Sequence, residues 1–240
     1  MTGLTLYVMV GREQEWRTRE LTRTLRKLRA GYACRYACEK PMRDKYYSDD
    51  RDLVKWATLT HIAMEFGLQT ILQVSYWRPE KVFPHFSFMG KRVPISNKVW
   101  TFFRNIHNIS RLGQKIGISI AVVDRLFNPD QRDAYVFEVK TKIQQAKRPL
   151  ALFLDPDTGL QPKRSCPEHT ATWEIQALWP ILKKREWLIL YQHARRNSNW
   201  RESVADELSS LCGNMKAHVV QSDDVGKDVA FICIEKEGVA

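Results

Sequence analysis

Two periods of apolar residues alternate along the chain from residue 49 onward. Helical spacing predicts a helix over 49–66 that ends at Gly67 and has an apolar face of Leu53, Trp56, Leu59, Ile62, Ala63 and Phe66. Continuous apolar runs predict strands buried on both faces, over 69–77, 118–124, 149–155 and 186–193. Further elements are predicted as helices over 97–117, 129–147, 169–184 and 199–213 and as a hairpin over 216–237.

This alternation of strands and helices predicts an α/β fold. Because buried parallel strands need crossover helices, we expect a Rossmann-like, doubly wound, mostly parallel sheet with a C-terminal antiparallel hairpin. The predicted domain covers 46–240. Residues 1–45 are predicted to form a basic N-terminal extension, with a short strand over 5–10 and a basic helix over 12–31.

The charge of the chain points to a polyanionic partner. The 240 residues carry a formal net charge of +11, and 44% of them are hydrophobic, which is enough for a well-filled core. A strongly basic balance is typical of proteins that bind nucleic acid. No apolar run approaches the roughly 18 residues that a membrane-spanning helix needs, so we expect no membrane span. The five cysteines lack disulfide-scaffold spacing and favour a cytoplasmic location, with Cys212 and Cys233 as predicted core residues.

Polar side chains stand where the predicted strands end. Asp124, Asp155 and His193 each close one of the apolar runs. Because the carboxyl ends of parallel strands meet at one edge of a sheet, we expect these three side chains to share a rim where a ligand binds. A proline and a glycine turn the chain away from the sheet after Asp155, so we expect the carboxylates of Asp155 and Asp157 to be exposed at this rim.

Two short motifs resemble a known family. Asp155 and the proline after it resemble the Asp-Pro-Pro-Tyr site of Rossmann-like amino-methyltransferases. Asp49, Asp52 and Lys55 have the spacing of an N-terminal motif in bacterial large-subunit ribosomal RNA adenine methyltransferases, and three-cysteine-motif partner proteins have a similar layout. The resemblance implies a nucleic-acid-directed enzyme that uses S-adenosylmethionine. It also implies that Asp155 accepts from the target amino group, Asp124 holds the cofactor ribose, and Lys55 with Asp52 shapes the cofactor pocket.

The chain departs from the pattern of that family at three points. The segment after the first strand reads VSYWRPEKVF, without the glycines that let a cofactor approach the backbone. Asp157 and Thr158 replace the second proline and the aromatic residue of the tetrad. One strand fewer is predicted between the runs that end at Asp124 and Asp155.

Two other functions are open at this stage. Asp155, Asp157 and His193 could form the site of a metal-dependent phosphodiesterase or nuclease, because Mg²⁺ and similar hard cations prefer oxygen ligands. Glu174, on the following helix, is predicted to be an ordinary solvated charge rather than a further ligand. The other hypothesis is a non-catalytic Rossmann-like module that binds nucleic acid or a partner protein.

Aromatic and basic residues indicate where nucleic acid would bind. Trp77 and Arg78 follow the first predicted strand, and Arg195 and Arg196 follow His193. Aromatic rings among cations suit stacked bases and phosphates. These four residues are therefore the predicted nucleic-acid contacts.

Overall fold

The structure is a computed structural model of the chain. It describes residues 6–9, 50–77, 85–94, 106–162, 169–222 and 226–238. The predicted contact Arg78 and three of the five cysteines lie outside these described residues.

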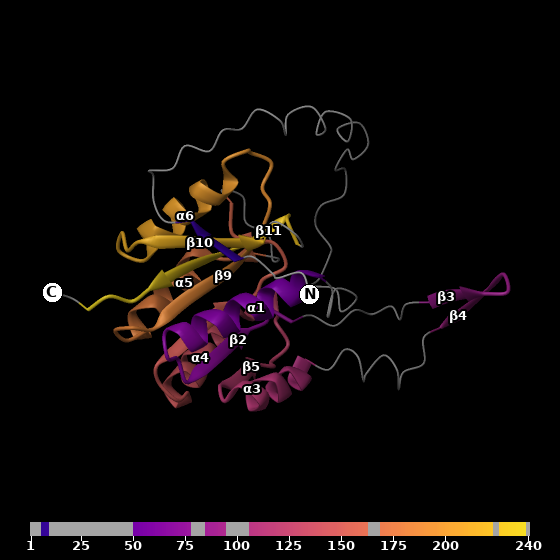
Figure 1. Ribbon diagram of the computed structural model, residues 1–240, viewed down its shortest axis with the longest axis horizontal. Helices are drawn as coiled ribbons and strands as arrows, with labels where there is room; N and C mark the ends of the chain where they lie inside the picture. Colours follow the sequence, from indigo (N-terminus) through magenta and orange to yellow (C-terminus); the bar gives the residue numbers. More distant parts are fainter. Residues whose placement is uncertain are drawn as a thin grey trace.

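In the described part of the chain, a seven-stranded mixed sheet with a parallel half and an antiparallel half forms the centre of the protein (Figure 1). Its strands in spatial order are β1 (Leu6–Met9), β10 (Ala217–Ser222), β11 (Val229–Glu235), β9 (Trp187–His193), β6 (Leu150–Leu154), β2 (Thr70–Val74) and β5 (Ser119–Val123). The neighbours β9, β6, β2 and β5 pair in parallel. β11 runs antiparallel to β9, β10 antiparallel to β11, and β1 antiparallel to β10. The fold is therefore mixed α/β.

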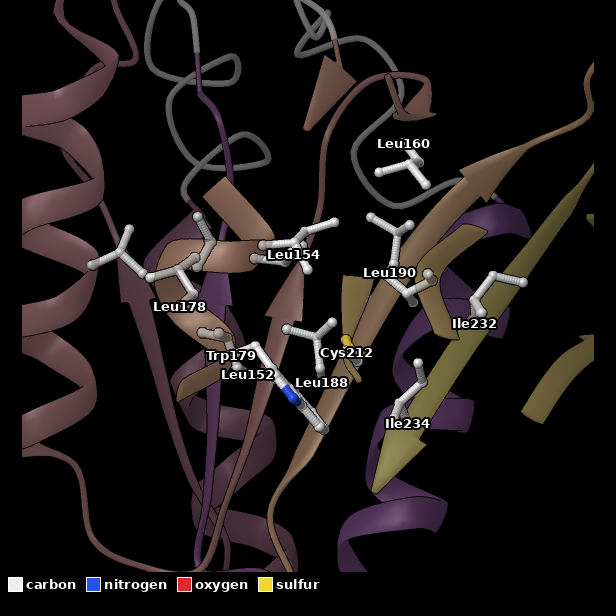
Figure 2. Packing of buried hydrophobic residues seen from close by; sticks show 14 of the residues in the cluster. Leu152, Leu154, Leu160, Leu178, Trp179, Leu188, Leu190, Cys212, Ile232 and Ile234 are labelled. Carbon is white, nitrogen blue, oxygen red and sulfur yellow. The ribbon is translucent and has the colours of Figure 1, made fainter. Parts of the chain in front are cut away.

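Helices cover both faces of this sheet. One face packs against α1 (Asp50–Glu65) and α3 (Ser110–Ile116), and the other against α4 (Arg132–Gln145), α5 (Thr172–Leu178) and α6 (Trp200–Leu211). Each face of the sheet has its own hydrophobic core, and alternate residues of a strand point to opposite faces. In β6, Leu152 and Leu154 pack in the core with α4, α5 and α6, whereas Phe153 packs in the core with α1. Figure 2 shows Leu152 and Leu154 beside Leu188 and Leu190 of β9.

Smaller elements complete the described chain. They are the strand pairs β3 (His85–Phe88) with β4 (Lys91–Pro94) and β7 (Gly159–Leu160) with β8 (His169–Thr170), and the 3-10 turns η2 (Ile106–Ile109), η3 (Pro129–Gln131) and η4 (Trp179–Ile181). None of the described helices is long and apolar enough to cross a membrane.

Most elements predicted from the pattern are present. Of the helix predicted over 97–117, residues 97–105 lie outside the described residues, η2 replaces its middle part, and α3 ends at Ile116. Three other predictions need correction.

The four predicted strands are confirmed as β2, β5, β6 and β9, and three of them are buried on both faces. The burial predicted for β5 is wrong, because β5 is the edge strand of the sheet and Ser119, Ala121 and Val122 are not buried. Cys212 and Cys233 are confirmed as buried core residues.

The helix predicted over 169–184 is wrong in length, because α5 ends at Leu178 and a 3-10 turn follows. Pro180 explains the end, since proline has no N–H to continue the helical hydrogen bonds.

The third correction concerns the buried face of α1. Four of the six predicted residues are buried, namely Trp56, Leu59, Ile62 and Ala63. Leu53 and Phe66 are exposed instead, by 58% and 39%. Lys55 and Asp52 are buried in place of Leu53 at the start of the helix, with 7% and 8% exposure. The first turn of α1 thus buries charged side chains where helical spacing predicted an apolar one.

We expect this difference to appear in the stability of two matched substitutions. Leu59→Ala should lower the free energy of unfolding by about 2–5 kcal/mol, because Leu59 is fully buried against the sheet. Leu53→Ala, the control on the same helix, should change it by less than about 0.5 kcal/mol. Urea denaturation followed by circular dichroism measures both. Equal losses for the two variants would contradict the observed face of α1.

Candidate functional site

Three parallel strands end together at one edge of the sheet. Val74, the last residue of β2, is level with Val123 at the end of β5 and with Leu154 at the end of β6. From β2 the chain crosses to β5 on one side and later to β6 on the other. Such a reversal of strand order opens a crevice beyond the carboxyl ends of the strands, where open α/β sheets bind ligands. A ligand-binding site is therefore expected at the switch point between β2 and β6.

Asp155 lies at this switch point, directly after β6. Its backbone N–H donates to the carbonyl oxygen of Val74 across the gap to β2, at 2.9 Å. Its carboxylate Oδ2 accepts from Lys55 Nζ at 3.0 Å and from Gln73 Nε2 at 2.7 Å. The side chain is buried, so the expectation that the Asp155 carboxylate is exposed at the rim is wrong. The carboxylate points back under α1 because an ammonium group and an amide are there to bond it.

Lys55 bonds two carboxylates at once. Besides Asp155, its Nζ donates to Asp52 Oδ1 at 2.8 Å, one helical turn earlier on α1. The ammonium also lies 5.0 Å from the centroid of the Tyr191 ring, a cation–π contact from β9. Burial alone lowers the pKa of Lys55, but the negative charges of Asp155 and Asp52 outweigh it and hold that pKa well above its ordinary value. Lys55 is therefore a permanent cation in this cluster.

The positive charge of Lys55 does not fully offset the effect of burial on the pKa of Asp155. Burial raises the pKa of Asp155, while the positive charge of Lys55 and the hydrogen bonds from Lys55 and Gln73 oppose that rise. Nearby Asp52 acts in the same direction as burial. Asp155 consequently binds a proton more readily than an ordinary aspartate, although an ammonium group stands beside it.

His193 lies at the outer side of the same edge, where β9 ends. Its Nε2 is 3.2 Å from Tyr191 Oη, and its Nδ1 is 3.9 Å from Asp228 Oδ2. Arg51 at the start of α1 holds that aspartate with Nη2 to Oδ2 at 2.6 Å and Nε to Oδ1 at 3.1 Å. Hydrogen bonds from Arg51 lower the pKa of Asp228. Tyr191 thus connects His193 to the buried cluster, since its ring also contacts Lys55.

The turn after Asp155 is fixed by Gln192 of β9. The Gln192 amide accepts from the Leu160 N–H at 2.8 Å and donates to the carbonyl oxygens of Thr158 at 3.0 Å and His193 at 2.7 Å. Gly159 has a φ of +113°, and a Cβ there would lie 2.2 Å from Gln192 Oε1. A side chain at residue 159 would therefore displace the glutamine that positions the turn.

The other predicted residues lie around this edge. Asp124 is exposed after β5, Asp157 is half-buried in the turn, and Trp77 is half-buried after β2. Arg196 is exposed. Arg195 donates to Glu207 at 2.9 Å and to the carbonyl oxygen of Leu160 at 3.0 Å. The bond to Leu160 helps to hold the turn that follows Asp155.

Glu174 corrects a prediction. It was expected to be a solvated helix charge, but it is fully buried. Its Oε2 accepts from the Ala171 N–H at 2.8 Å and from Tyr76 Oη at 3.1 Å, and its Oε1 accepts from Arg132 Nη1 at 2.8 Å. Burial raises the pKa of Glu174 against the opposing charge of Arg132. The position of Glu174 in the first turn of α5, where it bonds a helix-start N–H, was the signal that could have indicated burial.

The turn after β2 has a conformation that the sequence did not indicate. Tyr76 adopts a left-handed backbone with a φ of +47°, which glycine normally supplies. Its ring is buried in the core against Phe127 and Tyr135, and its N–H donates to Tyr135 Oη at 3.1 Å. A non-glycine residue in this region is strained, and such strain is common at functional sites.

Two members of the site were missed by sequence reasoning. Gln73 lies within an apolar strand and Tyr191 within another, so neither stood at a predicted strand end. A single polar side chain inside a run that should be buried on both faces was the available signal for Gln73. Within the described residues, no three histidine, cysteine, aspartate or glutamate side chains gather as a metal ion would require.

Comparison with known proteins adds no family. No protein-family model and no curated protein matches this chain. The site is therefore interpreted from its own geometry.

We expect the Lys55 cluster to stabilise the fold as a unit. Lys55→Met should lower the free energy of unfolding by about 3–5 kcal/mol, because it leaves two buried carboxylates without their cation. The double variant Lys55→Met with Asp155→Asn should lose less than the sum of the single variants, since the uncompensated charge is reduced.

The exposed pair of Arg195 and Glu207 provides the control. Glu207→Gln should cost at most about 1 kcal/mol, as expected for a surface ion pair. Guanidinium denaturation of all four variants measures these differences. Strict additivity of the Lys55 and Asp155 substitutions would contradict the coupling.

Proposed function

We propose that this protein is a nucleic-acid-directed enzyme of the S-adenosylmethionine-dependent methyltransferase type, built on a Rossmann-like doubly wound sheet. The single observation that supports the proposal most is the convergence of Asp52 and Lys55 on Asp155. Lys55 and Asp155 are 100 residues apart in the sequence, and the resemblance to ribosomal RNA adenine methyltransferases rests on these two motifs.

The geometry of Asp155 suits the recognition of an amino group. Lys55 and Gln73 both bond Oδ2, which leaves Oδ1 of the same carboxylate to accept from a target N–H. A hydrogen bond to the carboxylate increases the electron density on the amino nitrogen and orients its lone pair. Lys55 supports this role by keeping the carboxylate in one position. The raised pKa of Asp155 also allows it to hold a proton released from the amine.

Two features of the described residues fit the implied cofactor. The left-handed turn at Tyr76 has the backbone conformation of a glycine turn, and the tyrosine ring lies in the core instead of beyond the strand ends. Asp124 is exposed at the end of the neighbouring strand β5, where it would hold ribose hydroxyls. The Tyr76 N–H already bonds Tyr135, so it is not among the groups that would bind the cofactor. When bound, S-adenosylmethionine would supply an electrophilic methyl group.

The charge of the protein supports nucleic acid as the substrate. The chain has a net charge of +11, and Arg196 is exposed at the edge next to His193. Trp77 is half-buried beyond the end of β2 and offers an aromatic surface at that edge. The hypothesis of a metal-dependent phosphodiesterase or nuclease receives less support. It needs Asp155, Asp157 and His193 to bind one metal ion, whereas the Asp155 carboxylate bonds Lys55 and Gln73.

We expect Asp155→Asn to lower the rate of methyl transfer at least 100-fold. The amide oxygen would accept from Lys55 and Gln73, which leaves an NH₂ donor in place of the acceptor that faces the amine. The binding of S-adenosylmethionine should weaken far less than the rate falls, because Asp155 is assigned to the target amine and not to the cofactor. Calorimetry with S-adenosylmethionine measures binding, and mass spectrometry of unmethylated RNA transcripts and amplified DNA measures transfer.

Asp206→Asn, which changes an exposed carboxylate on α6, is the matched control and should match the parent protein in both measurements. Absence of heat at millimolar S-adenosylmethionine would contradict the proposed function. If salt-sensitive nucleic-acid binding remained in that case, a module without catalysis would be the better description.

A further inference from the structure

Gln73 has a buried acceptor that no described residue bonds. The side chain lies in the middle of β2 and is 1% exposed. Its Nε2 donates to Asp155 Oδ2 at 2.7 Å, but among the described residues none donates to its Oε1. A buried carbonyl oxygen without a donor is costly, and nearly all such groups in folded proteins have a partner. No described residue supplies this donor, so a ligand or water that reaches Oε1 would satisfy it.

The orientation of the Gln73 amide is fixed by its neighbour. Asp155 Oδ2 also accepts from Lys55 Nζ, so this oxygen is an acceptor towards Gln73. A flipped amide would place the Gln73 oxygen against the carboxylate oxygen, and two acceptors would then repel each other. The NH₂ group consequently faces Asp155, and Oε1 is the atom left for another donor.

This acceptor differs by its position from the other unpaired group on β2. Thr70 Oγ1, on the same strand, is also buried without a partner among the described residues. However, Thr70 stands at the amino end of β2, level with Ser119 and Leu150 at the starts of their strands. Gln73 instead bonds the switch-point carboxylate directly. It is thus the unpaired group that belongs to the candidate site.

We propose that Gln73 is a specificity-determining residue, whose Oε1 accepts one hydrogen of a ligand amino group while Asp155 accepts the other. This inference rests on the proposed nucleic-acid site and names the residue that selects its ligand. The two side chains are neighbours, since Gln73 Nε2 bonds Asp155 Oδ2. One acceptor from each would match the two hydrogens of an exocyclic amine, as in adenine or cytosine. Hypoxanthine and uracil have a carbonyl oxygen in place of that amino group. This oxygen would face the acceptor oxygens of Gln73 and Asp155 and be repelled by them.

The test compares nucleosides that differ in this one group. Adenosine against inosine and cytidine against uridine are titrated into the full chain and followed by ligand-observed NMR, without S-adenosylmethionine. We expect the amino member to bind at least tenfold more tightly in one or both pairs. Equal binding within both pairs, or no binding by any of the four nucleosides, would overturn the inference.

Two substitutions assign the selectivity to Gln73. Gln73→Met keeps the length of the side chain and removes its oxygen, so the preference for the amino nucleoside should fall to less than threefold. Thr70→Val removes the other unpaired group on β2 and should leave the preference unchanged. Retained preference in Gln73→Met would mean that only water bonds Oε1. Circular dichroism and thermal unfolding check that both variants fold.

The same titration separates this inference from the proposed function. If nucleoside selectivity depends on Gln73 but no methyl transfer occurs, the proposed reaction fails and the amino-group site stands. If methyl transfer occurs but Gln73→Met has the selectivity of the parent protein, the reaction stands and the role given to Gln73 fails.

Discussion

The ion pair between Lys55 and Asp155 is the interaction on which the rest of the site depends. A buried charge is tolerated when an opposite charge and hydrogen bonds surround it, and Lys55 obtains both from Asp155 and Asp52. Because Lys55 belongs to α1 and Asp155 follows β6, the pair fixes the start of the helix over the end of the sheet. Gln73 and Tyr191 take their positions around the same two charges.

The first turn of α1 organises two layers of the edge. Asp52 and Lys55 form the buried layer with Asp155, whereas Arg51 reaches Asp228 beside His193 in the outer layer. Tyr191 contacts both layers, because its hydroxyl bonds His193 and its ring makes a cation–π contact with Lys55. Loss of charge in the inner layer would therefore disturb the outer one, although the two layers come from residues far apart in the sequence.

Periodicity predicted the sheet strands because their burial requires continuous apolar runs, and helix ends at Gly67 and Gly213 follow from local backbone preferences. It could not predict that Leu53 faces outward while Lys55 faces inward, because that choice depends on a carboxylate brought close by the fold. The exposure expected for Asp155 was wrong for the same reason. The polar side chain of Gln73 within an apolar run was a signal, but its partner Asp155 could not be predicted, because Asp155 follows a different strand.

The protonation state of Lys55 tests this central ion pair most directly. Nitrogen-15 NMR of the lysine side chains, recorded from pH 8 to pH 12, follows the Lys55 ammonium through the titration of ordinary lysines near pH 10.4. Stabilisation by two buried carboxylates raises the pKa, so Lys55 should remain protonated after the other lysines have lost their protons, and Asp155→Asn should reduce this difference. A Lys55 signal that titrates at or below the ordinary value would contradict the ion pair.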